Sequence, residues 1–119
     1  MTEYLRARND FQRVYQQGKR YDGSLFTAFV LSNKLDRPRF GITASTKAVG
    51  NAVNRNRARR LLRETFRLKE PLLADLSQSY DFVINAKRKL PLLKVHAAFE
   101  EFEKLISRVA REENTQDVG

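Results

Sequence analysis

The residues best suited to chemistry are arginines gathered in one short stretch of the chain. Lys47–Lys69 contains eight basic residues against one acidic residue, Glu64, and so holds seven of the nine net positive charges. Within positions 55–67 every basic residue is arginine. A guanidinium group can hold phosphate oxygens through two parallel hydrogen bonds. The pattern therefore predicts a surface that binds a polyanion, with nucleic acid as the leading candidate.

The same arginines could instead form a solvated helix face that keeps the protein soluble. Such faces normally mix acidic with basic residues, whereas Glu64 stands alone in this one. Like charges four residues apart, as at Arg55/Arg59 and Arg59/Arg63, destabilise an isolated helix by roughly a few tenths of a kcal/mol per pair. Bound phosphates would offset that repulsion, so phosphate binding is the favoured interpretation.

Composition narrows the class of protein. The 119 residues include 23 Lys or Arg against 14 Asp or Glu, no cysteine and a single histidine, His96. Disulfide frameworks, cysteine nucleophiles and multi-histidine metal sites are therefore excluded. No apolar run approaches the ~20 residues of a membrane span, and the first residues hold no signal-peptide core. We expect one cytoplasmic domain over residues 1–119, without membrane contact and with a frayed tail from about residue 113.

A helix is needed to position the arginines. The longest predicted helix covers residues 51–69 and ends before Pro71. At about 100° per residue, apolar and basic side chains separate onto opposite sides. The apolar side collects Ala58, Leu61, Leu62, Thr65, Phe66 and Leu68. The basic side collects Asn56, Arg59, Arg60, Arg63 and Arg67. Arg55 falls near the apolar side, so its side chain is expected to reach over the sheet.

The other segments predict an α+β domain with a mostly antiparallel sheet. A short helix is expected over residues 9–17, with Asn9 as its N-cap and Gly18 as its stop. Strands are expected over residues 19–21, 25–31, 39–45 and 81–86. A hairpin turn is expected at Asp22-Gly23. A second amphipathic helix is expected from Lys94 to about Arg111.

Charged residues outside the arginine stretch receive structural assignments. Glu100, Glu101 and Glu103 are typical of a solvated helix face, and Asp10, Asp22, Asp36 and Asp81 are assigned to turns and caps at element ends. The loop residues Lys87, Arg88 and Lys89 suit either a phosphate contact or a solvated loop. His96 is assigned to the surface or to packing. No pair of nucleophile and general base is identifiable in the sequence.

Several different motifs follow one another in a defined order along the chain. An Arg55-Asn56-Arg57 core is followed by Arg59-Arg60 and then by Arg63-Glu64. Other segments agree with the same pattern in order and spacing: Asp10–Tyr15 with Gly18, Leu25–Leu31, Arg39–Thr43, and Asp81–Ile84 followed by Ala86-Lys87-Arg88. Together these motifs closely resemble the signature of the protein subunit of bacterial ribonuclease P, over nearly the whole chain.

The resemblance implies both a fold and a function. The family fold is an α-β-β-β-α-β-α sandwich whose four-stranded sheet contains a left-handed βαβ crossover, the ribosomal protein S5 domain 2-like arrangement. In the family a large RNA carries the catalytic centre, holds Mg²⁺ and removes the 5′ leader of precursor tRNA by endonucleolytic hydrolysis. The protein binds that RNA and the leader. The resemblance thus implies a cytoplasmic ribonucleoprotein subunit with no catalytic residues and no obligate protein partner; whether it binds a metal stays open.

Two binding surfaces follow from the resemblance. The catalytic RNA would be bound by Lys47, Arg55, Asn56, Arg57, Arg59, Arg60, Arg63 and Arg67. The precursor-tRNA leader would be bound in a cleft that contains Phe11, Tyr15 and Phe29. Helical and strand spacing alone would assign these aromatic residues to the core, and the resemblance reverses that preference. Exposed rings would stack on unpaired bases without demanding one sequence.

Two positions depart from the family pattern. Many members have paired lysines before the basic helix, whereas this chain has Thr46-Lys47-Ala48, which would remove one contact. Ala58 stands where a larger aliphatic residue is usual, which would loosen the packing of the helix on the sheet.

Two other functions remain open from the sequence. A DNA-binding or ribosome-associated module could use the basic helix generically, and equal affinity for duplex DNA and folded RNA would favour it. A protein-only nuclease would need a carboxylate cluster on the basic face, where Glu64 is the one acidic residue.

Overall fold

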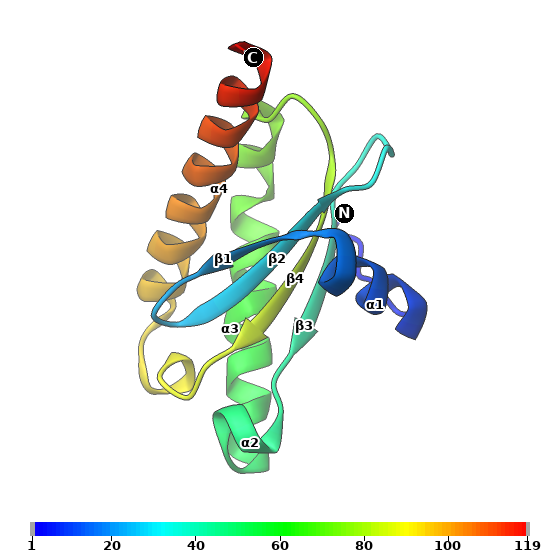
Figure 1. The fold of residues 1–119 in the computed structure, drawn as a ribbon. Coiled ribbons are helices and arrows are strands. Elements are labelled where there is room, and N and C mark those ends of the chain that lie inside the picture. Colours follow the sequence, from blue (N-terminus) through cyan, green and yellow to red (C-terminus); the bar gives the residue numbers. More distant parts are fainter. Residues whose placement is uncertain (1, 119) are drawn as a thin grey trace.

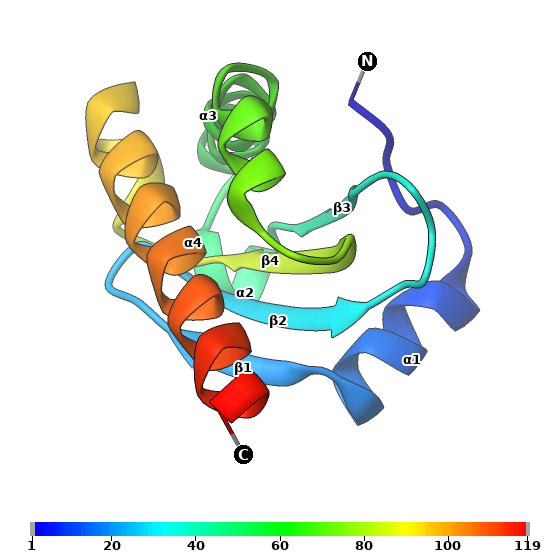
Figure 2. The ribbon, with the colours of Figure 1, turned by 90° about the horizontal axis from the view of Figure 1, so that it is seen from above.

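The structure, a computed structural model, describes residues 2–118, with side chains through Thr115. A four-stranded sheet forms its middle layer (Figures 1 and 2). Helix α1 (Arg8–Gln17) lies across one face of the sheet. Helices α3 (Ala52–Lys69) and α4 (Val95–Val118) cover the other face. The shorter helices are α2 (Thr46–Val49) and the 3₁₀ helices η1 (Glu70–Asp75) and η2 (Leu90–Leu92).

The sheet is mixed, in the order β1-β2-β4-β3. Its strands are β1 (Lys19–Asp22), β2 (Phe26–Ser32), β3 (Arg39–Thr43) and β4 (Tyr80–Ala86). Two pairings are antiparallel, and β3 pairs with β4 in parallel. In Figure 1 both β3 and β4 run downward, with β4 to the left of β3 and α3 behind the sheet. The β3–α3–β4 connection is therefore left-handed, against the usual rule, as the resemblance implied.

A cluster of aromatic rings fixes α3 against the sheet. Phe40, Phe66, Phe82 and Phe102 come from β3, α3, β4 and α4, and none is exposed to solvent. The rings of Phe40 and Phe66 stack with centroids 4.2 Å apart. The predicted apolar side of α3 is buried as expected, except for Leu68, which is 45% exposed. Leu68 lies at the margin of the apolar arc, close to the end of the helix.

Helix boundaries differ from the predicted ones at both ends of the chain. Helix α1 begins at Arg8 after an Ala7 cap without a side-chain hydrogen bond, so the N-cap assigned to Asn9 is wrong. The longest helix is α4, not α3, and it continues to Val118 where a frayed tail was expected. Buried Glu113 accepts hydrogen bonds from Ser77 N (2.9 Å) and Tyr80 Oη (2.5 Å), which fasten this part of α4 to the start of β4.

Glu101 organises the hairpin between β1 and β2. Its carboxylate accepts hydrogen bonds from the backbone N–H groups of Ser24 (3.0 Å), Leu25 (2.9 Å) and Phe26 (2.9 Å). Because Asp22 pairs with Thr27, the connection is longer than the two-residue turn predicted at Asp22-Gly23. Glu101 is therefore not part of a solvated face. It joins the hairpin to α4 through charge-assisted hydrogen bonds.

Candidate nucleic-acid interface

A short turn sets where α3 begins. Gly50, with φ of 117°, separates α2 from α3 and takes a backbone conformation that favours glycine. Asn51 then caps α3, and its Oδ1 accepts a hydrogen bond from Asn54 N at 2.9 Å. The cap fixes the rotation of α3 from its first turn, which decides which side chains point away from the sheet.

The outer side of α3 carries what we call the arginine face: Asn56, Arg59, Arg60, Arg63 and Arg67. These side chains are exposed or half-buried. Arg67 pairs with Glu64 (2.6 Å), and its hydrogen bond holds the pKa of that carboxyl below the ordinary value. Among the described side chains, Arg59, Arg60 and Arg63 form no ion pair. Three guanidinium groups are thus available to an anion from outside.

Two of the predicted arginines lie elsewhere, on the inner side of α3. Arg55 donates from Nε to Ala44 O (2.9 Å), which confirms that its side chain reaches toward the sheet. Arg57 donates from Nε to Pro91 O (2.7 Å) and from Nη2 to Leu93 O (3.1 Å). These bonds connect α3 to the segment that contains η2. The structure therefore divides the predicted arginines into an exposed group and a group bonded to the backbone.

This division predicts different effects for two single substitutions. Arg57→Ala would leave two carbonyl groups without a charged donor, so we expect the free energy of unfolding to fall by about 2 kcal/mol. Arg60→Ala removes no such bond and should leave that free energy unchanged. Urea unfolding of both variants measures the difference. Equal stability of the two variants would contradict the anchoring role of Arg57.

Basic side chains also gather where β3 and β4 end. Lys47 is exposed on α2, and its backbone carbonyl accepts a hydrogen bond from Arg88 Nη2 at 3.4 Å. The guanidinium of Arg88 lies beside Gly50. Lys87 does not belong to this group, because its Nζ donates to Asp22 Oδ1 (2.9 Å) and Gly23 O (2.6 Å) in the β1–β2 hairpin. We call Lys47, Arg55 and Arg88 the basic corner.

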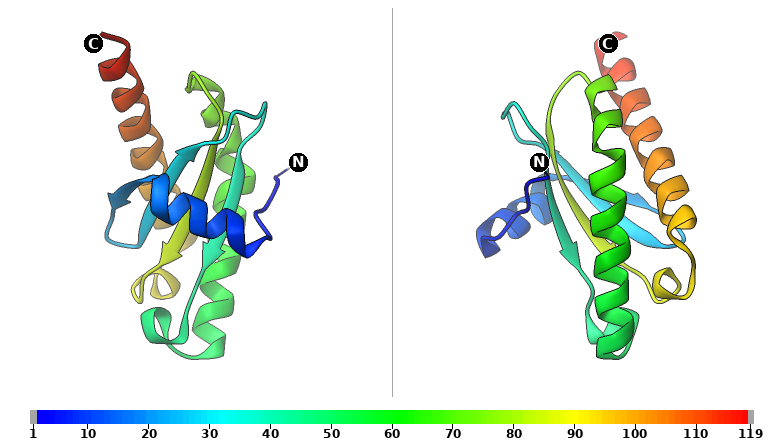
Figure 3. Two further views of the ribbon diagram at one scale, coloured as in Figure 1. Left: turned by 45° about the vertical axis from the view of Figure 1, so that its right-hand side comes forward. Right: turned by 180° about the vertical axis from the view of Figure 1, so that it is seen from behind.

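The three aromatic residues predicted to line a cleft converge on the opposite face of the sheet. α1 crosses this face (Figure 3). Phe11 lies directly over Gly41, where a β-carbon would collide with its ring. Tyr15 and Phe29 meet edge to face, with centroids 4.9 Å apart. Phe11 and Phe29 pack against a small core of Leu5, Val14 and Val83, while Tyr15 is 38% exposed. We call Phe11, Tyr15 and Phe29 the aromatic face.

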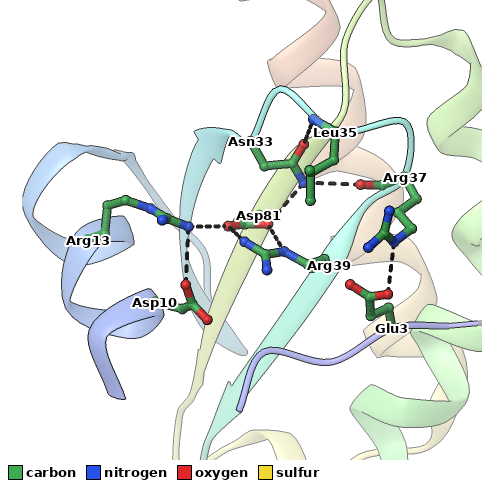
Figure 4. A network of polar contacts seen from close by, with 8 residues as sticks. All are labelled: Glu3, Asp10, Arg13, Asn33, Leu35, Arg37, Arg39 and Asp81. Atoms are coloured by element: carbon green, nitrogen blue, oxygen red, sulfur yellow. Dashed lines mark hydrogen bonds and ion pairs between the residues drawn. The ribbon is translucent and has the colours of Figure 1, made fainter. Parts of the chain in front are cut away.

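A buried carboxylate positions α1 on the sheet (Figure 4). Asp81 on β4 has no exposed side-chain surface. Arg39 donates to both of its oxygens, at 2.8 and 2.7 Å, and Arg13 of α1 donates to Oδ2 at 3.1 Å. Asn33 completes the set at 3.0 Å. The assignment of Asp81 to a turn or cap is therefore wrong, since it holds α1, β3 and the β2–β3 loop to β4.

A sequence model of the family described as Ribonuclease P matches residues 1–110. The chain belongs to the ribonuclease P protein family. It is 44% identical over 93 residues to the ribonuclease P protein component of Syntrophus aciditrophicus, covering 78% of this chain and 75% of that one. It is 36% identical to that of Natranaerobius thermophilus, over 87% of each chain. The Staphylococcus aureus RNase P protein superposes with a TM-score of 0.75, at 26% identity, covering 92% of this chain and 99% of that one.

Two surfaces of this ribonuclease P family protein lie on different layers. The aromatic face is formed by α1 and by β2, which α1 crosses, while the arginine face is on α3. α1 and α3 lie on opposite sides of the sheet (Figure 2). None of the helices in residues 2–118 combines the length and apolar character needed to cross a bilayer. Within the same residues, no group of three or more His, Cys, Asp or Glu side chains could hold a metal ion.

Sequence reasoning missed one polar residue beside the aromatic face. Asn85 sits on β4 and accepts hydrogen bonds from Tyr15 Oη (2.8 Å) and Thr43 Oγ1 (2.7 Å). An asparagine directly after the apolar run Phe82–Ile84 was the available signal. Strands buried on both faces rarely contain an amide without a specific set of partners.

Proposed function

We propose that this chain is the protein subunit of ribonuclease P and assists removal of the 5′ leader from precursor tRNA in the cytoplasm. The observation that carries the proposal is the arginine face. Arg59, Arg60 and Arg63 stand in a row on α3 without an acidic partner among the described side chains. Such an arrangement destabilises the isolated protein slightly and favours binding of a phosphate backbone.

In this proposal the arginine face binds the catalytic RNA. Guanidinium groups would neutralise phosphates along that RNA, and Asn56 would donate to a phosphate or base edge. Lys47, Arg55 and Arg67 would contribute at the ends of the face. Arg57 would act mainly by holding α3 to the segment around η2, because its donors already bond backbone carbonyls. The RNA would carry the catalytic centre and hold Mg²⁺, and the protein would supply no catalytic residue.

The aromatic face would hold the precursor-tRNA leader. Tyr15 offers an exposed ring, and Phe29 supports it edge to face. Stacking of unpaired bases on such rings accepts many sequences, as processing of different tRNA precursors requires. The basic corner lies beyond the ends of β3 and β4, at the start of α3, so an RNA strand that leaves the aromatic face in that direction would find cations there.

Reconstitution tests the proposal. The chain is combined with a bacterial ribonuclease P RNA at low Mg²⁺, and cleavage of precursor tRNA is followed by gel electrophoresis. We expect clear stimulation over the RNA alone. The protein without RNA serves as the control and should not cleave, whereas cleavage by it would favour a protein-only nuclease. Absence of stimulation would overturn the proposal.

A binding competition separates the proposal from a generic DNA-binding or ribosome-associated module. Fluorescence anisotropy would compare the affinity for the folded ribonuclease P RNA with that for duplex DNA of equal charge. We expect the RNA to bind more tightly, and leader length to affect the affinity for precursor tRNA. Equal affinities without a leader effect would favour the generic module.

Replacing one ring tests the aromatic face. Phe29→Leu keeps an apolar side chain, so the fold should tolerate it, but it removes the edge-to-face support of Tyr15. We expect the preference of the holoenzyme for precursor over mature tRNA to fall about tenfold, since stacking contributes roughly 1–3 kcal/mol per base. Competition binding measures that preference. Arg60→Ala is the matched control, and it should lower RNA affinity while leaving the preference unchanged.

A further inference from the structure

A groove of about 960 Å³ opens at the end of the sheet where β4 begins, opposite the basic corner (Figure 1). It lies between η1, the β2–β3 loop and the start of β4. Of the residues assigned above to the two RNA surfaces, only Arg67 lines it. Leu35 is 38% exposed, so part of the groove's apolar wall faces solvent. That wall contains Leu35, Pro38, Leu73, Leu76 and Phe82.

Glu70 places a carboxylate in this groove without a counter-ion from the chain. It is the C-cap of α3, where the negative end of the helix dipole disfavours a further negative charge. The two cations in the last turn of α3 pair elsewhere, Arg67 with Glu64 (2.6 Å) and Lys69 with Glu103 (3.6 Å). Among the described side chains, Glu70 forms no ion pair.

One oxygen of the Glu70 carboxylate is closed off from water. Oε1 is buried and, within the described residues, accepts no hydrogen bond. An enclosed acceptor without a donor is destabilising, the more so when it belongs to a charged group. The residue as a whole is half-buried and lines the groove, so the carboxylate remains accessible from its other side. A cation that reaches Oε2 from the groove would compensate the unpaired charge.

The form of this site favours an alkylammonium ion over other cations. A guanidinium group pairs best with both oxygens of a carboxylate, and here Oε1 is enclosed. Mg²⁺ and Ca²⁺ require several oxygen ligands, whereas the surrounding wall is apolar. An ammonium group is a compact charge that can bind to one oxygen. Methylene groups attached to it would cover the exposed apolar wall.

We propose that the groove binds an aliphatic polyamine, with one ammonium group on Glu70 Oε2 and the methylene chain along Leu35 and Leu73. Asp36 also lines the groove and is 90% exposed, and its ion pair with Arg37 (3.1 Å) lies in solvent, so it can receive a second ammonium group. The net charge of +9 does not attract cations to the chain as a whole, so binding depends on this local site. The inference concerns the protein without RNA and is independent of the proposed function.

Titration of the full chain with amines, followed by NMR of its backbone amides, tests this inference. Putrescine has four methylene groups, hexamethylenediamine has six, and hexanediol has six without charge. We expect hexamethylenediamine to shift the amide signals of residues 70–79 and to bind about tenfold more tightly than putrescine, since it buries two more methylene groups. Hexanediol should not bind detectably. Equal binding of the diol would overturn the inference, because apolar contact alone would then explain it.

Two substitutions at opposite ends of η1 locate the site. Glu70→Gln keeps the shape of the side chain but removes its charge, so we expect the affinity for either diamine to fall about tenfold. Asp75→Asn removes the same charge from an exposed side chain and is the matched control, with an expected change within about twofold. Equal losses in both variants would show a diffuse charge effect and overturn the inference, as would binding that survives Glu70→Gln.

A variant of the apolar wall separates contact with the methylene chain from charge. The backbone N–H of Leu35 donates to Asn33 Oδ1 (2.8 Å), a bond that Leu35→Ser leaves in place, so the loop should keep its conformation. We expect the advantage of hexamethylenediamine over putrescine to shrink to about threefold in this variant. An advantage that stays at its original size would contradict a chain that lies along Leu35.

A lysine derivative distinguishes a free polyamine from a protein partner. Nα-acetyl-lysine amide carries the same ammonium group on a peptide backbone, whose polar groups would meet the apolar wall. It should therefore bind more weakly than putrescine. Tighter binding of this probe would assign the groove to a lysine side chain of another protein and overturn the inference.

Discussion

Replacing Arg59, Arg60 and Arg63 together with alanine is expected to weaken binding of the catalytic RNA about a thousandfold while leaving the fold intact. None of the three forms an ion pair with a described side chain, so the folded protein loses nothing that holds it together. Each charge-assisted hydrogen bond to phosphate contributes about 1.5 kcal/mol, which corresponds to roughly tenfold in affinity. Filter binding at fixed salt measures the loss.

The salt dependence of binding gives a second measurement on the same variant. Each phosphate contact releases condensed counterions, so its removal flattens a plot of log affinity against log salt by up to about one unit. We expect the triple variant to lose up to about three units of slope. Thermal unfolding should show a melting temperature that does not fall, because the buried side of the helix is untouched and like-charge repulsion has been reduced.

A matched variant tests whether position matters or only charge. Arg20, Lys104 and Arg111 are exposed and lie away from the arginine face, on β1 and α4. Replacing all three with alanine lowers the net charge by the same amount. We expect a small and uniform loss of affinity from this control. If the control weakened RNA binding as strongly as the triple variant, the arginine face would not be the docking surface.

Local patterns were enough to predict most elements of the fold. The apolar arc of residues 58–66, the stop at Gly18 and the strands around Ala28 and Ile84 all follow from periodicity and turn residues. The left-handed crossover has no such local signal. It depends on how β3, α3 and β4 pack together, and it was expected only because the motifs resemble a known family.

Three acidic residues show where local patterns fail. Asp81, Glu101 and Glu113 were assigned to turns, to a solvated face and to a frayed tail. Each instead accepts hydrogen bonds from segments more than thirty residues away in the chain, such as Arg39 for Asp81 and Ser77 for Glu113. A carboxylate looks the same in sequence whether its partners are water or a distant N–H group. Only the tertiary structure decides which.

The candidate interface was predictable as a region but not residue by residue. Arginine content alone marks positions 55–67, yet Arg57 and Arg60 differ entirely in what they contact. Arg57 donates to Pro91 O, which lies in η2, 34 residues further along the chain. Helical phase already leaves Arg57 off the basic side of the helix, but only the tertiary structure shows which carbonyl groups it contacts. Asn85 was missed for the same reason, because its hydroxyl partners come from α1 and β3.

Replacing Asp81 with alanine is expected to lower the free energy of unfolding by about 3 kcal/mol. Removing one partner of a buried ion pair costs about 3–5 kcal/mol, because the remaining charge is left without compensation. The loss should lie at the lower end of this range, because the side chains of Arg39 and Arg13 are 19% and 41% exposed and water can solvate them once Asp81 is removed. Urea unfolding measures it. Asp36→Ala, at a side chain that is 90% exposed, is the control and should leave stability unchanged.

The pH dependence of stability provides an independent check on Asp81. Burial raises the pKa of this carboxyl, but hydrogen bonds from Arg39, Asn33 and Arg13 outweigh burial and hold the pKa below its ordinary value. A carboxyl with a lower pKa in the folded chain stabilises that chain when ionised. Its contribution is therefore complete above the ordinary pKa of about 4 and is lost as the pH falls through the lower folded value. The unaltered protein should lose stability more steeply than Asp81→Asn below about pH 4, and parallel curves would contradict an ionised Asp81.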